Sequence, residues 1–344
     1  MTSTDALAAA DCEQVLVVRD RDADVTAIVA VHDTRLGPAH GGIRRWRYAD
    51  LGAALADAVA LAQAMTWKCA LAEIAAGGGK SVILDRDGLD RAAAYRLVGR
   101  TVAQLGGRYF TGPDVGTGDD DLRVVADETR FVALDRDGAG PGDLTAATAT
   151  GVFAALTALA ERLHTPVGRL RVAVQGLGAV GQQLCRQLHA AGAQLVVSDV
   201  VPARAEAAAA AFGATVVAPA DILAEPCDVL APCALGGVLS DAVCERLTAR
   251  GVCGAANNIF AGDSAATILH RRGVPVVPDF VANAGALIQG ATWHLHGERV
   301  GEARLQRIAR TAGELLDRAV AENVPPSVLA LRVARERVGG SLSP

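Results

Sequence analysis

The sequence feature that most constrains this chain is a glycine-rich turn between a short β-rich run and a helical run. Residues 171–175, RVAVQ, lead directly into the motif GLGAVG at 176–181, and a helical pattern follows. In a turn of this kind Gly176 permits a tight bend, Gly178 lets the backbone approach a pyrophosphate, and Gly181 lets the helix pack closely on the strand. An ordinary tight turn is the alternative. The strand–turn–helix context predicts a dinucleotide site with its phosphates at the helix N-terminus.

An acidic residue follows the next β-rich run. Asp199 ends the run at 194–198 and lies 18 residues beyond Gly181, near the spacing of about 20 residues at which such folds carry a ribose-binding carboxylate. A carboxylate there accepts hydrogen bonds from both ribose hydroxyls and repels a 2′-phosphate, which favours NAD over NADP. Arg204, five residues further on, would weaken this preference.

β-rich and helical runs alternate around the motif, a pattern typical of a parallel, doubly wound sheet. A length of 344 residues suggests two domains, and the Gly/Pro/Asp-rich stretch at 135–143 is the best linker candidate. We therefore expect an α/β protein. An N-terminal mixed α/β catalytic and oligomerisation domain would consist of 1–135 with 303–344. A Rossmann-type doubly wound dinucleotide-binding domain would span 136–302, with a cleft between the two.

Within the first domain, the β-rich runs at 14–18 and 26–31 predict a hairpin. Apolar residues at helical spacing predict a helix over 51–65. Short strands are expected over 81–84 and 131–134. These elements precede the expected linker.

Composition excludes several classes of function. The chain has 33 Lys+Arg against 38 Asp+Glu, a formal net charge of −5, which disfavours a nucleic-acid partner. No apolar run reaches the roughly 20 residues that span a bilayer, and the start MTSTDALAAADCEQ does not resemble a signal peptide. We therefore expect a cytoplasmic protein with no membrane partner. The seven Cys form no C-x-x-C pair, and His294 and His296 do not share a helical face, so we predict no metal site.

Two lysines stand out because nearly all of the Lys and Arg residues are arginines. Lys68 lies in MTWKCA and Lys80 in GGGKSVI. A buried amine shifts its pKa and can transfer a proton, which a guanidinium cannot do. Gly77–Gly79 would let substrate approach Lys80, and a second ammonium nearby would lower its pKa towards neutrality. Gly41 and Gly42 are likewise expected where backbone approaches substrate. The alternative is a pair of solvated lysines.

Four further polar residues lie at loop positions. Asp114 follows a short β-rich run in TGPDVGT, where it would act in catalysis or cap a turn. Asn257 and Asn258 follow a strand of the second domain, and Asn283 precedes a helix. At the carboxyl edge of a nucleotide-binding sheet these asparagines would face the nicotinamide or the substrate. They could equally be helix caps.

Taken together, the motifs resemble the Glu/Leu/Phe/Val amino-acid dehydrogenase family, in its leucine/phenylalanine/valine branch. The resemblance covers nearly the whole chain. Its carriers are LGPAHGGIRRW at 36–46, MTWK at 65–68, GGGK at 77–80, TGPDVGT at 111–117, VQGLGAVG at 174–181, APCALGG at 231–237, AANN at 255–258 and PDFVANAG at 278–285.

The resemblance implies reversible oxidative deamination, in which an L-amino acid, NAD⁺ and water give a 2-oxo acid, ammonium and NADH. It implies that Lys68 binds the substrate α-carboxylate, that Lys80 is the general base for the attacking water, and that Asp114 carries protons to and from the amino group. It also implies a homo-oligomer, a dimer or higher. Three more residues are implied in binding: Asn258 at the substrate, and Thr148 and Asn257 near the cofactor.

The expected side-chain pocket departs from the family pattern. His40 stands where branched-chain enzymes commonly have Leu and glutamate enzymes Lys, and it could pair weakly with a γ-carboxylate or stack on an aromatic ring. Gly112 and Leu287 resemble phenylalanine-type enzymes, and Gly290 lies one helical turn beyond Leu287 and would deepen the pocket. A bulky apolar or aromatic substrate is therefore favoured.

Other functions remain open from sequence. A branched-chain substrate is the nearest alternative, and an acidic substrate held by His40 is a weaker one. A 2-hydroxy-acid dehydrogenase would use a His/Arg pair instead of two lysines. An NAD-sensing regulatory protein without turnover would be expected to lack the lysine pair.

Overall fold

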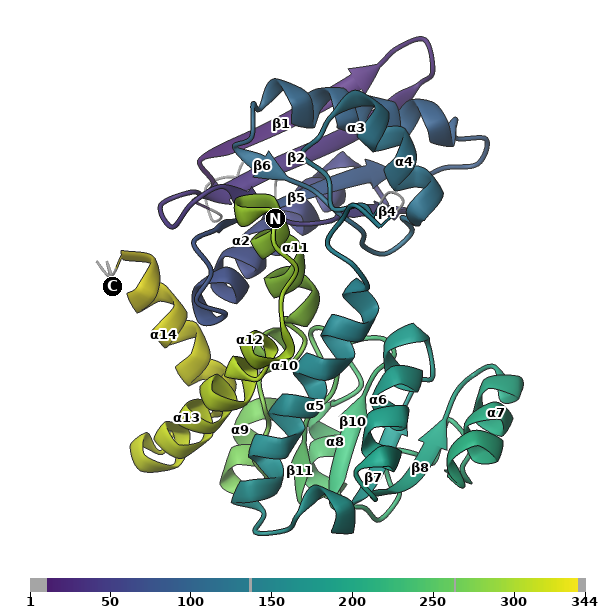
Figure 1. Cartoon of the computed structure of the whole chain (residues 1–344), viewed down its shortest axis with the longest axis vertical. Helices are drawn as coiled ribbons and strands as arrows, with labels where there is room; N and C mark the ends of the chain where they lie inside the picture. The colour runs from purple at the N-terminus through teal and green to yellow at the C-terminus, as the bar shows by residue number, and fades with distance from the viewer. Residues whose placement is uncertain (1–10, 136–137, 263, 340–344) are drawn as a thin grey trace. The chain divides into compact units, whose positions relative to one another are not determined.

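The computed structural model describes residues 11–135, 138–262 and 264–339 (Figure 1). The start of the chain, from which we expect no signal peptide, lies outside the described residues up to position 10, as do positions 136 and 137 of the expected linker. The chain divides into two compact units. The first unit consists of Met1–Gly142, Leu287–Val300 and Ala334–Pro344, and the second of Asp143–Ala286 and Gly301–Val333.

The first unit contains a six-stranded mixed sheet. The order is β1-β2-β5-β3-β6, and β4 also pairs with β5. The hairpin β1–β2 and the β2–β5 pair are antiparallel, while β3, β4 and β6 join in parallel. The predicted hairpin is confirmed. The strands are β1 (Gln14–Asp20), β2 (Val25–Asp33), β3 (Ala39–His40), β4 (Ile43–Trp46), β5 (Gly77–Leu84) and β6 (Tyr109–Phe110).

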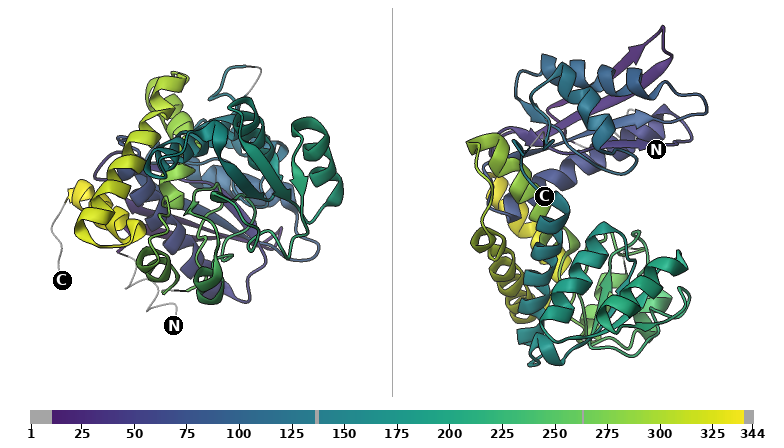
Figure 2. Two further views of the ribbon diagram at one scale, coloured as in Figure 1. Left: turned by 90° about the horizontal axis from the view of Figure 1, so that it is seen from below. Right: turned by 45° about the vertical axis from the view of Figure 1, so that its right-hand side comes forward.

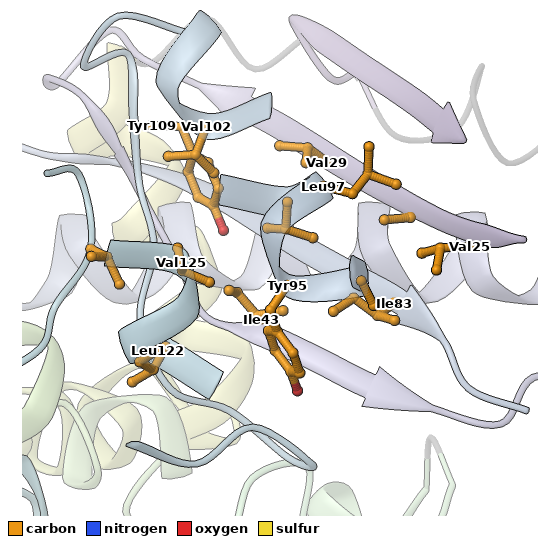
Figure 3. Close-up of a cluster of buried hydrophobic side chains, with 14 of the residues drawn as sticks. Val25, Val29, Ile43, Ile83, Tyr95, Leu97, Val102, Tyr109, Leu122 and Val125 are labelled. Atoms are coloured by element: carbon orange, nitrogen blue, oxygen red, sulfur yellow. The ribbon is translucent and has the colours of Figure 1, made fainter. Parts of the chain in front are cut away.

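Helices cover both faces of this sheet, because the side chains of β2 alternate between two hydrophobic cores. Val29 and Val31 pack with the core on the side of α3 (Arg91–Gln104) and α4 (Asp119–Glu128). Figure 3 shows Tyr95 and Tyr109 within this aliphatic cluster. On the other face, Ile28 and Ala30 pack against α2 (Leu51–Leu71). α2 begins after Asp50, whose carboxylate accepts from the Ala53 amide at 2.8 Å. It extends beyond the expected 51–65 and therefore includes Lys68.

The second unit contains a five-stranded, wholly parallel sheet in the order β11-β10-β7-β8-β9. The strand order reverses direction at β7, which precedes the glycine motif. This is the doubly wound arrangement expected from the alternating pattern. The strands are β7 (Arg171–Gln175), β8 (Gln194–Ser198), β9 (Thr215–Val216), β10 (Val229–Pro232) and β11 (Gly251–Val252). The helices are α5 (Leu144–Arg162), the 3₁₀ turn η1 (Val167–Arg169), α6 (Ala179–Ala190), α7 (Pro202–Phe212), α8 (Asp241–Arg246), α9 (Ala265–Arg271) and α10 (Asp279–Ala282).

The C-terminal helices correct the expected domain boundaries. They are α11 (Gly285–His296), α12 (Glu302–Leu305), α13 (Arg307–Glu322) and α14 (Pro326–Gly339). The expected grouping of 303–344 with 1–135 is wrong for 303–333, because α13 packs along α5 in the second unit (Figures 1 and 2). Conversely, 287–300 belongs to the first unit although it was expected in the second. An amphipathic helix can cover either core, and only packing decides which.

α5 is the one helix in the described part of the chain that is long and apolar enough to cross a membrane. It contacts α6 and α13 within the second unit, and 56% of its most apolar 18-residue window is buried. Its composition is therefore accounted for by its place in a protein core.

Candidate active site

The three motif glycines lack side chains for three different reasons. Gly176 has φ +95°, a region that favours glycine, and an added Cβ would lie 2.7 Å from the Ala234 Cβ. At Gly181 an added Cβ would lie 2.1 Å from the Gly176 carbonyl oxygen, where α6 begins against β7. Gly178 has an ordinary φ of −66°, and nothing lies within 4 Å of an added Cβ. No contact within the described chain therefore requires glycine at position 178. Glycine there fits the close approach of a group from outside the protein.

Asp199, the residue after β8, hydrogen-bonds to this turn. Its carboxylate accepts from the Leu177 amide at 2.7 Å and from the Val201 amide at 2.8 Å. Its side chain is only 5% exposed, and the Arg204 guanidinium lies 3.6 Å away. Each carboxylate oxygen retains a lone pair for a ribose hydroxyl. Asp199 therefore holds the glycine turn in shape as well as occupying the expected ribose-binding position.

The asparagines form a small network in the second unit. The Asn283 Nδ2 donates to the Ala255 carbonyl at 3.1 Å and to Asn257 Oδ1 at 2.7 Å. Asn283 is 6% exposed, and its Oδ1 is buried without a hydrogen-bond partner in the described structure. An orphaned acceptor of this kind fits a carboxamide N–H of a bound nicotinamide. The Asn258 amide donates to Asp279, and Asn258 adopts φ +51°, which asparagine tolerates.

Thr148 also lies in the second unit, in the first turns of α5. Its hydroxyl donates to the Leu144 carbonyl at 2.9 Å. Its expected proximity to the cofactor stays a prediction.

The first unit holds a buried pair between the two expected catalytic groups. Lys80 on β5 is 5% exposed, and its Nζ lies 2.8 Å from Asp114 Oδ2. Asp114 comes from the loop between β6 and α4. The Nε of Arg44 donates to the same Asp114 oxygen at 3.1 Å. Arg44 was not among the expected site residues, although it lies in the motif LGPAHGGIRRW.

Burial and the neighbouring charges shift both pKa values. Burial lowers the pKa of Lys80, and Arg44 lowers it further, while Asp114 opposes this change. Burial alone would raise the pKa of Asp114, but Lys80 and Arg44 outweigh it and lower the pKa. From sequence, Lys68 was the cation expected beside Lys80. In the structure, Arg44 is the cation that contacts Asp114, the ion-pair partner of Lys80. The site thus combines a carboxyl group that stays ionised at neutral pH with an amine that loses its proton more easily than an ordinary lysine does.

Lys68 lies in the last turn of α2, partly buried. Lys68 and Lys80 are the only two lysines in the sequence. α2 packs directly on β5, because an added Cβ at Gly78 would lie 2.2 Å from the Thr66 amide nitrogen. The elements that carry the two lysines are therefore neighbours in the first unit.

The glycines before Lys80 make room for the protein itself. An added Cβ at Gly77 would lie 1.8 Å from the Asp33 carbonyl oxygen, and one at Gly79 would lie 2.7 Å from the Tyr109 ring. The expectation that Gly77–Gly79 leave space for substrate is therefore wrong: backbone and a buried ring fill that space.

Gly41 and Gly42 also lie against protein backbone. An added Cβ at Gly41 would be 1.7 Å from the Gly79 carbonyl oxygen. At Gly42 it would be 2.4 Å from the Pro113 carbonyl oxygen and 2.8 Å from the Asp114 Cβ. Gly42 thus lets the Asp114 loop approach closely. Binding of substrate by the two glycines stays a prediction.

His40 belongs to a cluster of aromatic rings in the first unit. Its ring stacks on Phe110 at a centroid distance of 5.0 Å, and His294 of α11 lies 4.6 Å from Phe110 and 5.4 Å from His40. Burial lowers the pKa of each histidine to about 4. His40 is therefore neutral at pH 7, and because the Pro38 carbonyl can only accept, its Nδ1 carries the proton in the 2.9 Å bond between them. It offers no positive charge to a γ-carboxylate.

The other expected pocket residues gather nearby. Added Cβ atoms at Gly112 and Gly290 would lie 3.3 Å and 3.9 Å from the Ala133 Cβ. Gly290 lies one helical turn before His294 on α11, and Leu287 lies near the start of that helix. From sequence, His294 was a candidate only for metal binding and not for this aromatic cluster. Among the described residues, no group of three or more His, Cys, Asp or Glu side chains is arranged to hold a metal ion.

The site residues thus fall into two sets. Lys68, Lys80, Asp114 and the aromatic cluster lie in the first unit, whereas the glycine motif and the asparagine network lie in the second. A doubly wound dinucleotide fold joined to a unit with a buried lysine–carboxylate pair is typical of an oxidoreductase that uses a nicotinamide cofactor.

The family can be stated more closely. Residues 12–131 match the family model described as Glu/Leu/Phe/Val dehydrogenase, dimerisation domain, and residues 140–203 and 204–293 match that of Glutamate/Leucine/Phenylalanine/Valine dehydrogenase. The chain belongs to the Glu/Leu/Phe/Val dehydrogenase family, in its leucine/valine branch, and is an amino-acid dehydrogenase.

Three relatives show how close this similarity is. The chain is 38% identical over 335 residues to leucine dehydrogenase of Bacillus cereus, covering 95% of this chain and 91% of the relative. It is 40% identical over 337 residues to valine dehydrogenase of Streptomyces albus, covering 95% and 92%. The crystal structure of L-tryptophan dehydrogenase from Nostoc punctiforme superposes with a TM-score of 0.83 at 37% identity, covering 97% of this chain and 98% of that one.

Proposed function

We propose that the protein is an NAD-dependent L-amino-acid dehydrogenase that reversibly deaminates a bulky apolar or aromatic L-amino acid to its 2-oxo acid and ammonium. The observation that carries this proposal is the buried contact between Lys80 and Asp114 at 2.8 Å, in a chain that also contains a dinucleotide-binding unit. The nicotinamide, when bound, accepts hydride from the substrate Cα.

The remaining steps fall to this chain's own residues. Lys68 holds the substrate α-carboxylate. Lys80 takes a proton from the water that attacks the substrate iminium, and Asp114 carries protons to and from the amino nitrogen. A lowered pKa of Lys80 supports this assignment, because a general base must be unprotonated when water attacks. The lowered pKa of Asp114 keeps it an acceptor at neutral pH.

The choice of NAD is supported by Asp199. A carboxylate at this position repels a 2′-phosphate, and Asp199 is fixed there by two backbone amides. Arg204 has the opposite effect, because its guanidinium, 3.6 Å from Asp199, would attract a phosphate. We therefore expect tighter binding of NADH than of NADPH, with a preference that increases in Arg204→Ala.

The side-chain preference is supported by the aromatic cluster. A neutral His40 stacked on Phe110 presents an apolar, ring-rich surface, and Gly112 and Gly290 lack side chains beside Ala133. These features favour a bulky apolar side chain over an acidic one. The similarity to a tryptophan dehydrogenase supports an aromatic substrate, while the similarity to leucine and valine dehydrogenases supports a branched-chain substrate as the second candidate.

A panel of 2-oxo acids, assayed with ammonium and with NADH or NADPH, tests these assignments. We expect a higher kcat/KM for phenylpyruvate or indolepyruvate than for 2-oxoglutarate. Highest activity on 4-methyl-2-oxopentanoate would select the branched-chain alternative. Turnover without ammonium would instead indicate a 2-hydroxy-acid dehydrogenase, and NADH binding without any turnover a regulatory protein.

Lys80→Ala tests the assigned base. We expect turnover to fall by about 10²-fold or more, whereas NADH binding should be unchanged, because the coenzyme residues lie in the other unit. Lys68→Ala is the matched variant, and it should chiefly raise KM for the 2-oxo acid. Near-normal turnover in Lys80→Ala would show that the assigned mechanism is wrong.

We also propose that the protein is a homo-oligomer. The description of the family model for 12–131 as a dimerisation domain supports this proposal. Light scattering coupled to size exclusion should report at least a dimer, and a monomeric mass at micromolar concentration would contradict it.

A further inference from the structure

Arg44 joins the Lys80–Asp114 pair to a second carboxylate. Its Nε donates to Asp114 Oδ2 at 3.1 Å, and its Nη1 donates to Asp57 Oδ2 at 3.1 Å. Asp57 projects from α2 and also accepts from the Tyr48 hydroxyl. All these groups lie in the first unit. The result is a continuous line of alternating charges that ends at Lys80.

The backbone of β4 fixes this arrangement. β4 pairs in parallel with β5, the strand of Lys80. On its other side, the Ile43 amide donates to the Gly112 carbonyl at 2.9 Å and the Arg45 amide donates to the Val115 carbonyl at 3.0 Å. These two bonds bracket the Asp114 loop. Backbone contacts on both edges of β4 therefore direct the Arg44 side chain towards Asp114.

Two cationic donors share one oxygen of Asp114. Arg44 stays charged throughout the accessible pH range, so its positive charge near Lys80 is permanent. It fixes Asp114 as a carboxylate and repels a proton on Lys80, while Asp57 partly cancels that repulsion. The phenols of Tyr109 on β6 and of Tyr48 also interact electrostatically with the Asp114 carboxylate.

We infer that Arg44 is a positioning residue that holds the Asp114 carboxylate against Lys80 and, together with Asp57, sets the charge around this pair. The inference rests on the proposed function, in which Lys80 is the base. It predicts that Arg44 and Asp57 tune the proton affinity of Lys80 in opposite directions, which a merely structural role would not do.

The presence of only two lysines makes Lys80 directly observable. Protein labelled with ¹³C,¹⁵N-lysine should give two side-chain Cε–Nζ signals, and Lys68→Arg identifies the one from Lys80. The pKa of Lys80 then follows from a pH titration of the intact protein. The acidic limb of kcat/KM against pH gives the same quantity from turnover.

Arg44→Met removes the permanent positive charge. We expect the pKa of Lys80 to rise by about one unit and the acidic limb of kcat/KM to move to higher pH by a similar amount. Asp57→Asn removes a negative charge and leaves Arg44 on Asp114, so both quantities should move to lower pH. Arg44→Lys keeps the charge and should restore the pH profile towards that of the unsubstituted protein.

Arg45→Met is the matched control. Arg45 is the next residue of β4, is similarly buried and has its own carboxylate partner, Asp85, but does not contact Asp114. It should change stability without moving the Lys80 titration. Should Arg44→Met fail to fold, Asp57→Asn and Arg44→Lys still carry the test.

The outcomes separate this inference from the proposed function. Loss of turnover in Lys80→Ala, with an unmoved Lys80 titration in Arg44→Met or a shift of the same sign in Asp57→Asn, would overturn the inference alone. Near-normal turnover in Lys80→Ala would overturn the proposed function, whatever the titrations show.

Discussion

His40 and His294 show how single residues acquire properties that their residue type does not suggest. Each ring is packed against Phe110, and the buried Nε2 of His40 has no hydrogen-bond partner in the described structure. Desolvation therefore disfavours the protonated form of both rings. From sequence, His40 was a candidate for binding a γ-carboxylate, but a neutral ring in an apolar cluster does not serve that role.

This burial predicts a specific loss of stability in acid. The folded-state pKa of His294, about 4, lies below the value of 6.5 for an unperturbed histidine, so the unfolded chain takes up the proton first. The free energy of unfolding is therefore unaffected by this ring above pH 6.5. It decreases as the pH falls towards 4, by at most about 3 kcal/mol for one ring.

His294→Phe should therefore make the protein less sensitive to acid. Urea unfolding between pH 7 and pH 4.5 is expected to show a shallower fall in the free energy of unfolding than in the unsubstituted protein. His296→Gln, on the same helix but exposed, is the control and should leave the slope unchanged. Equal slopes in all three proteins would contradict the assignment of a low pKa to His294.

At the scale of elements, the strand–turn–helix unit of β7, the glycine motif and α6 was predictable because its signals are local. The hairpin β1–β2 was predictable for the same reason. One expected strand was less successful: 131–134 contributes only an isolated bridge, between Val132 and Thr111. A short apolar run is compatible with a strand, but pairing depends on what the rest of the fold places beside it.

The separate roles of the motif glycines lead to a second prediction. Gly178→Ala should leave the free energy of unfolding unchanged within about 0.5 kcal/mol, because open space surrounds the new methyl group. NADH binding, followed by fluorescence titration, should weaken by at least tenfold.

Gly181→Ala is the informative comparison. Its methyl group would lie 2.1 Å from the Gly176 carbonyl oxygen, so this variant should lose stability as well as NADH affinity. Retention of full NADH affinity in Gly178→Ala would show that the coenzyme does not approach this turn as proposed.

At the scale of the whole molecule, the C-terminal helices decide how the chain is divided. Ile308 at the start of α13 is 3% exposed, and its Cδ1 would lie 2.7 Å from a Cβ added at Gly151 of α5. Arg162 of α5 and Asp317 of α13 are joined by hydrogen bonds of 3.0 Å and 2.6 Å. α13 is therefore a structural part of the second unit.

Ile308→Ala should thus destabilise the second unit specifically. A cavity against α5 is expected to cost about 2–4 kcal/mol, and hydrogen exchange should speed up in α5 and α6. Ile83→Ala, in the core of the first unit, should instead speed exchange in that unit's sheet. Faster exchange in β2 and β5 on substitution of Ile308 would support the domain division expected from sequence.

Local patterns and short motifs in the sequence were enough to predict the glycine turn after β7, the order of most elements and the family, and they singled out Lys80 and Asp114 as candidates. The tertiary structure decided which distant residues meet. It placed Arg44 on Asp114, His294 beside His40 and α13 on α5, and it showed that Gly77–Gly79 accommodate the protein's own backbone and Tyr109. The physical reason is that packing and desolvation act between segments far apart in the chain, whereas local patterns report only on neighbours.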